Sequence, residues 1–466
     1  RPTAIFAYTI KGYGLPIAGH PLNHSAMLTG EHVEALRGEL GLAAEEEWSR
    51  FPEGSPEAVM CAAAAARMGD RRRTSPPRLG IAVPSQAPGP VRGASTQEAF
   101  GRVLADLSRE AEVGERLVTT APDVAVSTNL GGWINRVGIY GSEDEQSVEG
   151  DALQWSVRPS GQHIELGISE MNLFLLLSQL GLAYEHSGHL LVPIGTVYDP
   201  FVCRGLDALI YALYNGARFV IAGTPSGISL SREGGAHQST ITPSIGMELP
   251  GLSYVEPSYP AEVDWLLRHH VDQLLNAGAA AESLYLRLST KPIDPAPFEA
   301  LRRARGDEAL RADVLAGGYR LAEPAEGAES RVSIVACGAL LPEALAAREL
   351  LWEQDEIGAS VIALTSPDIA YRSHQAAATS PISDASRVRP ASHLARLLAP
   401  DRRAPIVSVI DGASHCLSFL GGAIGARQIA LGVDQFGQCG SLAALYDHHE
   451  LSPDAIAGAA IAALET

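Results

Sequence analysis

Short apolar runs that end in small or polar residues alternate along this chain with longer helical patterns. The strand-like runs are 4–8, 117–120, 190–197, 218–223, 283–288, 331–337, 360–364, 405–410 and 428–433. The helical patterns lie at 96–110, 170–183, 204–214, 261–276 and 342–354. Alternation of this kind is typical of parallel sheets covered by helices on both faces, so we predict an α/β fold. In such folds the loops after the strands meet in one crevice, where ligands bind.

Two stretches interrupt the alternation. Residues 70–93 are basic and rich in Pro and Gly, which is typical of a linker or an extended segment. A second stretch, 294–316, combines Pro, Ala and Arg before a new strand–helix series. A chain of 466 residues allows roughly two to four domains. We predict two doubly wound parallel-sheet domains, at 94–293 and 310–466, preceded by a remnant of a third α/β domain.

The composition restricts the partners and the compartment. The chain has 54 acidic against 35 basic residues, a formal charge of −19, which disfavours nucleic acid and anionic membranes as partners. Its five cysteines lie far apart and form no CxxC pair, which favours a reducing cytoplasm over a disulfide framework. No signal-peptide pattern is visible, and the most apolar stretch, 173–183, is too short for a bilayer. We therefore expect a cytoplasmic protein in which residues 173–183 form a buried helix.

Several familiar cofactor motifs are missing from the sequence. It contains no GxGxxG after a strand, no HExxH and no GxSxG. Its only lysines, Lys11 and Lys291, do not stand in a Walker A loop. His20 and His24 have the spacing of metal ligands, but Pro21 between them places both on a loop. We predict no metal ligands in this chain.

The segment 161–172 leads directly into the most apolar helical pattern. Glu170 lies at the start of that helix, among Ile168, Met171 and Leu173. A helix N-terminal carboxylate that interacts with the macrodipole is one interpretation of Glu170. The other is a carboxyl group that shares a proton with a heterocycle.

The pattern Gly-x-x-Ile-x-x-Gly-Ile-x-Glu, which ends at Glu170, resembles the pyrimidine-domain motif of thiamine diphosphate enzymes in the transketolase superfamily. Further segments resemble parts of these enzymes in the family order. Residues 9–14 are similar to the last strand and exit loop of the diphosphate-binding domain, and 122–129 to the first strand end of the pyrimidine domain. Residues 198–204 resemble the aromatic pair at the aminopyrimidine, 233–238 the substrate-facing histidine loop, and 432–437 the C-terminal-domain signature.

The homodimeric type of pyruvate dehydrogenase is the most similar branch, because residues 11–14, 19–24 and 51–55 all resemble it. This family is normally much longer, and its Gly-Asp-Gly motif for diphosphate and magnesium is missing here. The resemblance implies the tail of a diphosphate-binding domain at 1–45, a linker at 46–93, a pyrimidine-binding domain at 94–293, a linker at 294–309 and a transketolase-like C-terminal domain at 310–466.

The resemblance also implies roles for single residues around the cofactor. Glu170 would hydrogen-bond the aminopyrimidine ring, and Ile168 would support the bent conformation of the cofactor. Tyr198 and Phe201 would line or stack on the pyrimidine, and Arg204 follows them in the motif. An ordinary core aromatic is the alternative for Phe201.

Two histidines would act on the substrate. His237 would donate a hydrogen bond as charge develops on the substrate carbonyl or carboxylate, and His24 would belong to a catalytic loop that closes over the site. Asp123, expected at the cofactor, and Ser127, expected at the substrate, follow a strand that ends at the same crevice. Turn chemistry is the alternative for Ser127.

Some positions depart from the family pattern. Val124 replaces an acidic residue that is frequent in pyruvate dehydrogenases, and the stretch after His237 lacks a second histidine. Residues 94–98 and 222–226 lack the Arg and His that hold sugar phosphates in transketolases. The departures at 94–98 and 222–226 favour a 2-oxo acid over a ketose phosphate, while Val124 and the missing histidine leave the identity of the acid open.

The resemblance implies a thiamine diphosphate-dependent enzyme that decarboxylates a pyruvate-like 2-oxo acid and transfers the acyl or two-carbon unit to an acceptor such as a lipoyl group. Thiamine diphosphate and Mg²⁺ would be anchored by a second subunit or an N-terminal polypeptide that carries Gly-Asp-Gly. A homodimer or heterotetramer, with a lipoyl acyltransferase as a further partner, is expected. The alternatives are ketol transfer or acyloin formation in a split two-subunit enzyme, a non-catalytic partner subunit, and a degenerate binding module.

Overall fold

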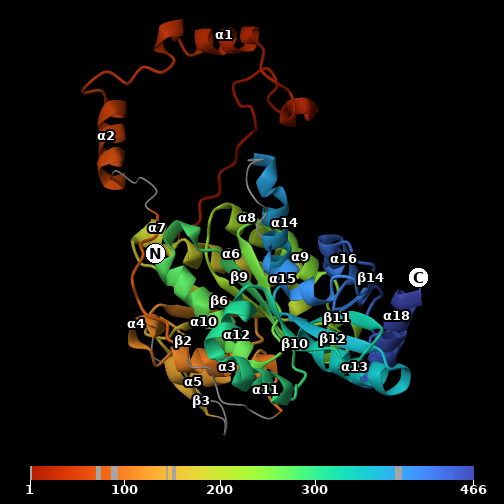
Figure 1. Ribbon diagram of the computed structural model, residues 1–466. Coiled ribbons are helices and arrows are strands. Elements are labelled where there is room, and N and C mark those ends of the chain that lie inside the picture. The colour runs from red at the N-terminus through yellow and green to blue at the C-terminus, as the bar shows by residue number, and fades with distance from the viewer. Residues whose placement is uncertain are drawn as a thin grey trace. The chain divides into compact units, whose positions relative to one another are not determined.

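The computed structural model describes residues 3–69, 75–85, 93–142, 145–149, 154–383 and 391–465. The chain divides into two compact units, Arg1–Thr74 and Ser75–Thr466 (Figure 1). Within the described ranges, no helix is both long and apolar enough to span a membrane.

The first unit consists of short helices joined by extended chain. Its elements are η1 (Pro21–His24), α1 (Gly30–Glu39), η2 (Ala44–Glu46) and α2 (Pro56–Met68). Side chains of Thr29 and Ser55 cap α1 and α2 by accepting backbone N–H bonds. The strand predicted at 4–8 is wrong, because a strand needs a paired neighbour and residues 3–69 contain no other strand. No residue in 3–69 is buried, so this unit has no core of its own.

A nine-stranded sheet lies in the N-terminal part of the second unit. Its order is β3-β4-β2-β5-β1-β6-β7-β9-β8, and all its pairs are parallel except β3–β4. The strands are β1 (Leu117–Ala121), β2 (Ile139–Tyr140), β3 (Glu145–Glu149), β4 (Gln154–Arg158), β5 (His163–Glu165), β6 (Val192–Val197), β7 (Val220–Gly223), β8 (Leu252–Val255) and β9 (Ser283–Arg287). Its helices are α3 (Thr96–Leu107), α4 (Ala111–Gly114), α5 (Gly131–Val137), α6 (Glu170–Gly181), α7 (Ala183–Ser187), η3 (Asp199–Gly205), α8 (Leu206–Tyr214), η4 (Ile228–Leu230), η5 (Gly235–His237), α9 (Thr242–Glu248), α10 (Pro260–Asn276) and η6 (Gly278–Ala280).

A five-stranded sheet follows, in the order β10-β12-β11-β13-β14. Only its edge strand β10 is antiparallel to its neighbour. The strands are β10 (Gly318–Ala322), β11 (Arg331–Cys337), β12 (Gly358–Leu364), β13 (Ile406–Val409) and β14 (Gln428–Leu431). The helices are α11 (Ala296–Arg305), α12 (Asp307–Leu315), η7 (Gly338–Leu340), α13 (Leu341–Asp355), α14 (Pro367–Ser383), α15 (His393–Leu398), η8 (Ala399–Asp401), η9 (Ser414–Leu417), α16 (Phe419–Ile424), α17 (Leu442–His448) and α18 (Pro453–Glu465). The predicted doubly wound α/β fold is confirmed.

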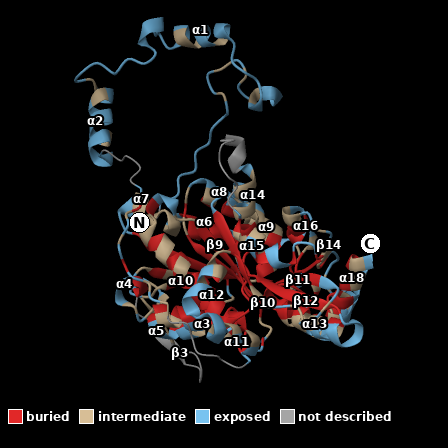
Figure 2. Cartoon of the chain, viewed as in Figure 1, coloured by how far each residue is buried: buried red, intermediate tan, exposed pale blue. Residues whose placement is uncertain are grey.

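Both faces of each sheet carry apolar side chains, as buried parallel strands require. In β7, Val220 and Ala222 face the core shared with α3, α5 and α10, whereas Ile221 faces the cluster that contains α6 and α8. Figure 2 shows the resulting buried sheets beneath half-buried helices. The helix predicted at 173–183 is α6, but the prediction that it is buried is only half correct. Its face around Leu173 is inside, while Met171 and Leu175 are 40% and 51% exposed.

Two predicted linkers have definite structure. Residues 75–85 extend along α10, where Leu79 N–H donates to the Leu275 carbonyl at 3.1 Å and the Asn276 side chain bonds both backbone groups of Ile81. Residues 294–309 contain α11 and the start of α12 rather than a break in the helices. Phe298 of α11 is buried among the rings of Tyr259, Trp265 and Tyr319, which explains why this Pro- and Arg-containing stretch is ordered. The predicted domain boundaries themselves remain a prediction.

A buried arginine joins the two sheets. Arg287, at the end of β9, donates to Asp199 at 2.8 Å, to Glu256 at 2.8 Å and to the Asp411 carbonyl at 2.7 Å. Asp199 also accepts bonds from Thr242 at 2.6 Å and from Ser239 and Tyr285. Because Arg287 and Asp199 each bind several partners and Arg287 also reaches Asp411, which follows β13, the network ties the two sheets together.

Candidate functional site

Four neighbouring parallel strands end at the same edge of the nine-stranded sheet. These are β5, β1, β6 and β7, in that spatial order. Glu170 begins α6 after β5, Tyr198 follows β6, and His237 ends η5 after β7. Parallel strands with this order bring their following loops to one crevice, and the predicted site residues lie there.

Glu170 and Arg204 form an ion pair at this edge. Arg204 Nη1 donates to Glu170 Oε1 at 2.6 Å, and the guanidinium carbon lies 3.6 Å from the centroid of the Phe201 ring. Glu170 is 9% exposed, whereas the Arg204 side chain is 53% exposed. The carboxylate is therefore sheltered by the protein on one side and by a water-exposed cation on the other.

Three rings, those of Tyr198, Phe201 and His237, pack together beside this ion pair, and we call them the ring cluster. Tyr198 and Phe201 stack with their planes 11° apart and their centroids 6.0 Å apart. The His237 ring lies 5.8 Å from Tyr198 and 5.5 Å from Phe201. His237 Nδ1 is buried without a hydrogen-bond partner in the structure. A buried ring nitrogen that lacks a partner is costly in a purely structural residue, so His237 has hydrogen-bonding capacity left for a ligand.

The fold brings these residues together through the turn η3. Asp199 follows Tyr198 and is fixed by the buried network at Arg287. At the other end of the turn, a side chain at Gly205 would clash with Phe174 of α6, so glycine allows η3 to approach the helix that carries Glu170. Anchoring at both ends places Tyr198, Phe201 and Arg204 beside Glu170.

Three other predicted residues lie on the same edge outside the ring cluster. Asp123 is exposed with φ of 63°, and its backbone N–H donates to Glu165 at 2.8 Å. Ser127 Oγ donates to the Val124 carbonyl at 3.2 Å, which is the turn chemistry considered as its alternative. Ile168 is 79% exposed. Their roles toward a cofactor or substrate remain predictions.

His24 belongs to the first unit. Its Nδ1 lies 3.1 Å from Lys11 Nζ, and the neighbouring Asn23 donates to the Lys11 carbonyl at 2.5 Å. These local bonds close the loop that carries His20 and His24. The proposed catalytic role of His24 stays a prediction.

The sequence analysis did not predict a chain of hydrogen-bonded side chains that ends at Glu165, the acceptor of the Asp123 N–H. Trp133 Nε1 donates to Thr119 at 2.7 Å, Thr119 contacts His163 at 2.9 Å, and His163 Nε2 lies 3.3 Å from Glu165. Burial opposes ionisation of Glu165, but its bonds to His163 and to the Asp123 N–H hold the pKa of Glu165 below its usual value. The sequence could have predicted the contact of His163 with Glu165, because these residues are two positions apart in a strand and share one face.

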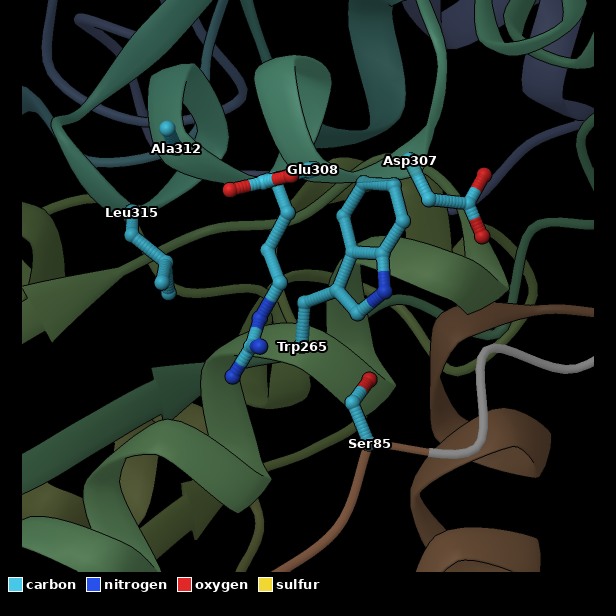
Figure 3. A pocket seen from close by; sticks show the side chains of 7 residues that line it. Ser85, Trp265, Asp307, Glu308, Ala312 and Leu315 are labelled. Atoms are coloured by element: carbon cyan, nitrogen blue, oxygen red, sulfur yellow. The ribbon is translucent and has the colours of Figure 1, made fainter.

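A separate cavity lies away from this edge of the sheet. It has a volume of about 690 Å³ between α10, α12 and the extended segment that ends at Ser85 (Figure 3). Trp265 of α10 and Arg311, Ala312 and Leu315 of α12 line it. It shares no residue with the ring cluster. Within the described residues, no group of three His, Cys, Asp or Glu side chains could hold a metal ion.

Comparisons with known sequences identify both sheets. Residues 81–289 match the family model of the pyruvate dehydrogenase E1 component middle domain, and residues 317–452 match the transketolase-like C-terminal domain. The pyruvate dehydrogenase E1 component of Cupriavidus necator is 24% identical over 94% of this chain and 50% of that protein. That of Corynebacterium glutamicum is 26% identical over 78% of this chain and 42% of that protein. The chain thus spans about half the length of the curated relatives it matches.

Solved structures with the same fold include the transketolase from Leishmania mexicana. Its TM-score is 0.69 at 16% identity, over 97% of this chain and 60% of that one. A structure described as a split gene transketolase, inactive beta4 tetramer, has a TM-score of 0.51 at 19% identity, over 80% of this chain and 99% of that one. The chain therefore contains a middle domain of the pyruvate dehydrogenase E1 type and a transketolase-like C-terminal domain, and it is similar to the thiamine diphosphate-dependent enzymes that carry these two domains.

Proposed function

We propose that this chain supplies the pyrimidine-binding half of a thiamine diphosphate site in an enzyme that decarboxylates a 2-oxo acid. The acyl or two-carbon unit would pass to an acceptor such as a lipoyl group. The observation that carries this proposal is the cluster at the carboxyl edge of the sheet, in which Glu170, Tyr198, Phe201 and His237 are held in contact through Arg204 and the stacked rings.

The residues present fit the aminopyrimidine end of the cofactor. A sheltered carboxylate at Glu170, the flat rings of Tyr198 and Phe201 and the unpartnered Nδ1 of His237 are the groups that a planar, hydrogen-bonding heterocycle requires. Thiamine diphosphate, when bound, supplies the carbon nucleophile and electron sink for 2-oxo-acid decarboxylation. Glu170 would share a proton with the aminopyrimidine ring, and His237 would donate a hydrogen bond to the substrate oxygens.

A further chain is proposed for the diphosphate end. The described residues offer no metal-binding group, so the polypeptide with the Gly-Asp-Gly motif would hold Mg²⁺ and diphosphate. The exposed apolar side chains of α6 and α8 support the binding of a partner chain to the surface that these two helices form. They are Met171, Leu175, Ile210, Tyr211 and Tyr214. The similarity over 99% of a split gene transketolase chain, described as an inactive beta4 tetramer, supports an oligomer with a partner subunit, for which we propose a homodimer or heterotetramer.

Ketol transfer or acyloin formation in a split enzyme is the second candidate, and the likeness to transketolase structures favours it. The positions at 94–98 and 222–226 favour the 2-oxo acid instead, because they lack the predicted phosphate-binding Arg and His. A lipoyl acyltransferase partner and a cytoplasmic location are further parts of the proposal.

The test compares substrates in the assembled enzyme. The chain is purified with the polypeptide that carries Gly-Asp-Gly, and thiamine diphosphate and Mg²⁺ are titrated into the pair and into each part alone. We expect saturable, cofactor-dependent release of carbon dioxide from pyruvate or another 2-oxo acid only with the pair. Turnover of xylulose 5-phosphate alone would support the second candidate, and no turnover with intact cofactor binding would support a non-catalytic subunit.

A further inference from the structure

The loop that carries His237 lies against the C-terminal domain. We define the histidine loop as residues 231–238 and the C-terminal loop as residues 437–440. Ser231 Oγ donates to the Gly440 carbonyl at 3.1 Å. Gln238 Nε2 donates to the Ser231 carbonyl and to the Gln438 carbonyl, each at 3.0 Å. The amide of Gln238 therefore closes the histidine loop on itself and ties it to the C-terminal loop.

The backbones of the two loops also pack closely. A side chain at Gly235 would clash with the Gly437 carbonyl, and one at Gly437 would clash with Gln238 Oε1. A Cβ at Gly234 would lie 2.5 Å from Cys439 Sγ. Glycines at these positions let two backbones approach to a distance that no larger residue allows.

The segment is anchored to the C-terminal domain on both sides of the histidine loop. Asp411 accepts the N–H groups of Ile228 and Ser229 at 2.8 and 2.9 Å. After the loop, the Thr240 carbonyl accepts the Ala413 N–H at 2.9 Å. The His237 side chain itself contacts the rings of Tyr198 and Phe201 on the middle domain. The position of His237 at the proposed site is thus set by a surface of the other domain.

We infer that the C-terminal domain positions the proposed substrate-binding histidine, with Gln238 and Gly437 as the positioning residues. This inference rests on the proposed function for its catalytic consequence. Its structural part, the fixing of the histidine loop, can be measured without turnover. The two carbonyl acceptors fix the orientation of the Gln238 amide, because a flipped amide would place oxygen against oxygen.

The test uses two disruptive variants and one matched control in the full chain with its partner. Gln238→Met removes both donors at similar volume, and Gly437→Ala inserts a methyl group against Gln238 from the other domain. Gln438→Ala is the control, because only its backbone carbonyl takes part and its side chain is exposed. Hydrogen exchange of peptides covering 231–240 should be about tenfold faster or more in both disruptive variants and within about twofold of wild type in the control.

Turnover is measured on the same samples. We expect kcat to fall about tenfold or more in Gln238→Met and Gly437→Ala while the half-saturating thiamine diphosphate concentration stays within about twofold, because Glu170 and Tyr198 are untouched. Unchanged exchange in both variants, or faster exchange with unchanged kcat, would overturn the inference. Absence of turnover in the wild-type assembly would instead count against the proposed function, and the exchange result would then decide the loop contact by itself.

Discussion

Two carboxylates, Asp199 and Glu170, lie at the same sheet edge but have opposite surroundings. Asp199 is fully buried, and its partner Arg287 is fully buried as well. Glu170 is 9% exposed, and the side chain of its partner Arg204 is 53% exposed. Both carboxylates bind an arginine, so charge pairing alone does not distinguish them.

The difference lies in how many acceptor positions are already used. Asp199 accepts bonds from Arg287, Thr242, Ser239 and Tyr285, which is close to the full capacity of a carboxylate. The only side-chain hydrogen bond of Glu170 in the described structure comes from Arg204. We call a carboxylate of the first kind sealed, because its acceptor positions are occupied and it stabilises the fold. One of the second kind is open, because it retains hydrogen-bonding capacity for a ligand. Substitutions at each carboxylate test this division.

The largest effect is expected at Glu170. Glu170→Gln keeps the shape of the side chain but removes its ability to share a proton with the cofactor ring. Cofactor-dependent turnover of the assembled enzyme should fall about 100-fold or more, as expected for loss of an acid–base group. The urea midpoint of unfolding should stay near that of wild type. Turnover within fivefold of wild type would refute the central site assignment.

The reverse pattern is expected at Asp199. Asp199→Asn removes one of the two carboxylates that bind the buried Arg287 guanidinium and leaves Glu256 as the other, and breaking a buried pair costs up to about 3–5 kcal/mol. Urea unfolding followed by circular dichroism measures this loss in the isolated chain. Glu170→Gln is the matched control. If both variants lose similar stability, the division between sealed and open carboxylates fails.

Glu262 sharpens the comparison, because it is buried without a cation. It accepts bonds from Tyr319 at 2.6 Å and from the N–H groups of Ser258 and Tyr259 at 2.6 and 2.9 Å. Burial raises the pKa of Glu262 from its usual 4.5 to about 7, against the effect of these bonds. The native state then binds more protons than the unfolded state between those values, so the free energy of unfolding falls as pH rises through this window.

Glu262→Gln should remove that contribution. The variant should match wild type near pH 4.5 and become more stable than wild type by up to about 3 kcal/mol near pH 8. Urea unfolding of both proteins at several pH values gives this difference directly. A difference that does not change with pH would show that Glu262 stays ionised in the fold, like the arginine-paired carboxylates.

Sequence patterns predicted the alternating elements well, and physical reasons explain the errors. β11 was predicted at its exact bounds because it is a continuous apolar run buried on both faces. The run at 4–8 is also apolar but has no partner strand in residues 3–69, so an apolar pattern without a pairing strand led to a wrong prediction. The helices at 296–305 and 307–315 were missed because only Phe298, Leu310 and Val314 in them are buried, and the ring partners of Phe298 come from distant elements.

The site was reached from the sequence through motif order rather than through local chemistry. No sequence feature near Glu170 indicates that Arg204 binds its carboxylate, because that contact depends on the close approach of Gly205 to Phe174. The network at Arg287 joins residues more than eighty positions apart and has no sequence signature. Likewise, contact of Gln238 with the C-terminal loop follows from the packing of two domains.

The smallest effect is expected for a substitution of Arg204. It tests whether the guanidinium competes with the cofactor or contacts it directly. Its guanidinium covers the Phe201 ring and binds Glu170, so it competes with a heterocycle for both. A half-exposed ion pair is worth at most about 1 kcal/mol. Arg204→Met should therefore lower the half-saturating thiamine diphosphate concentration by about two- to fivefold while kcat changes little. A rise of similar size would instead mean that Arg204 contacts the cofactor directly, as its place in the family motif predicts.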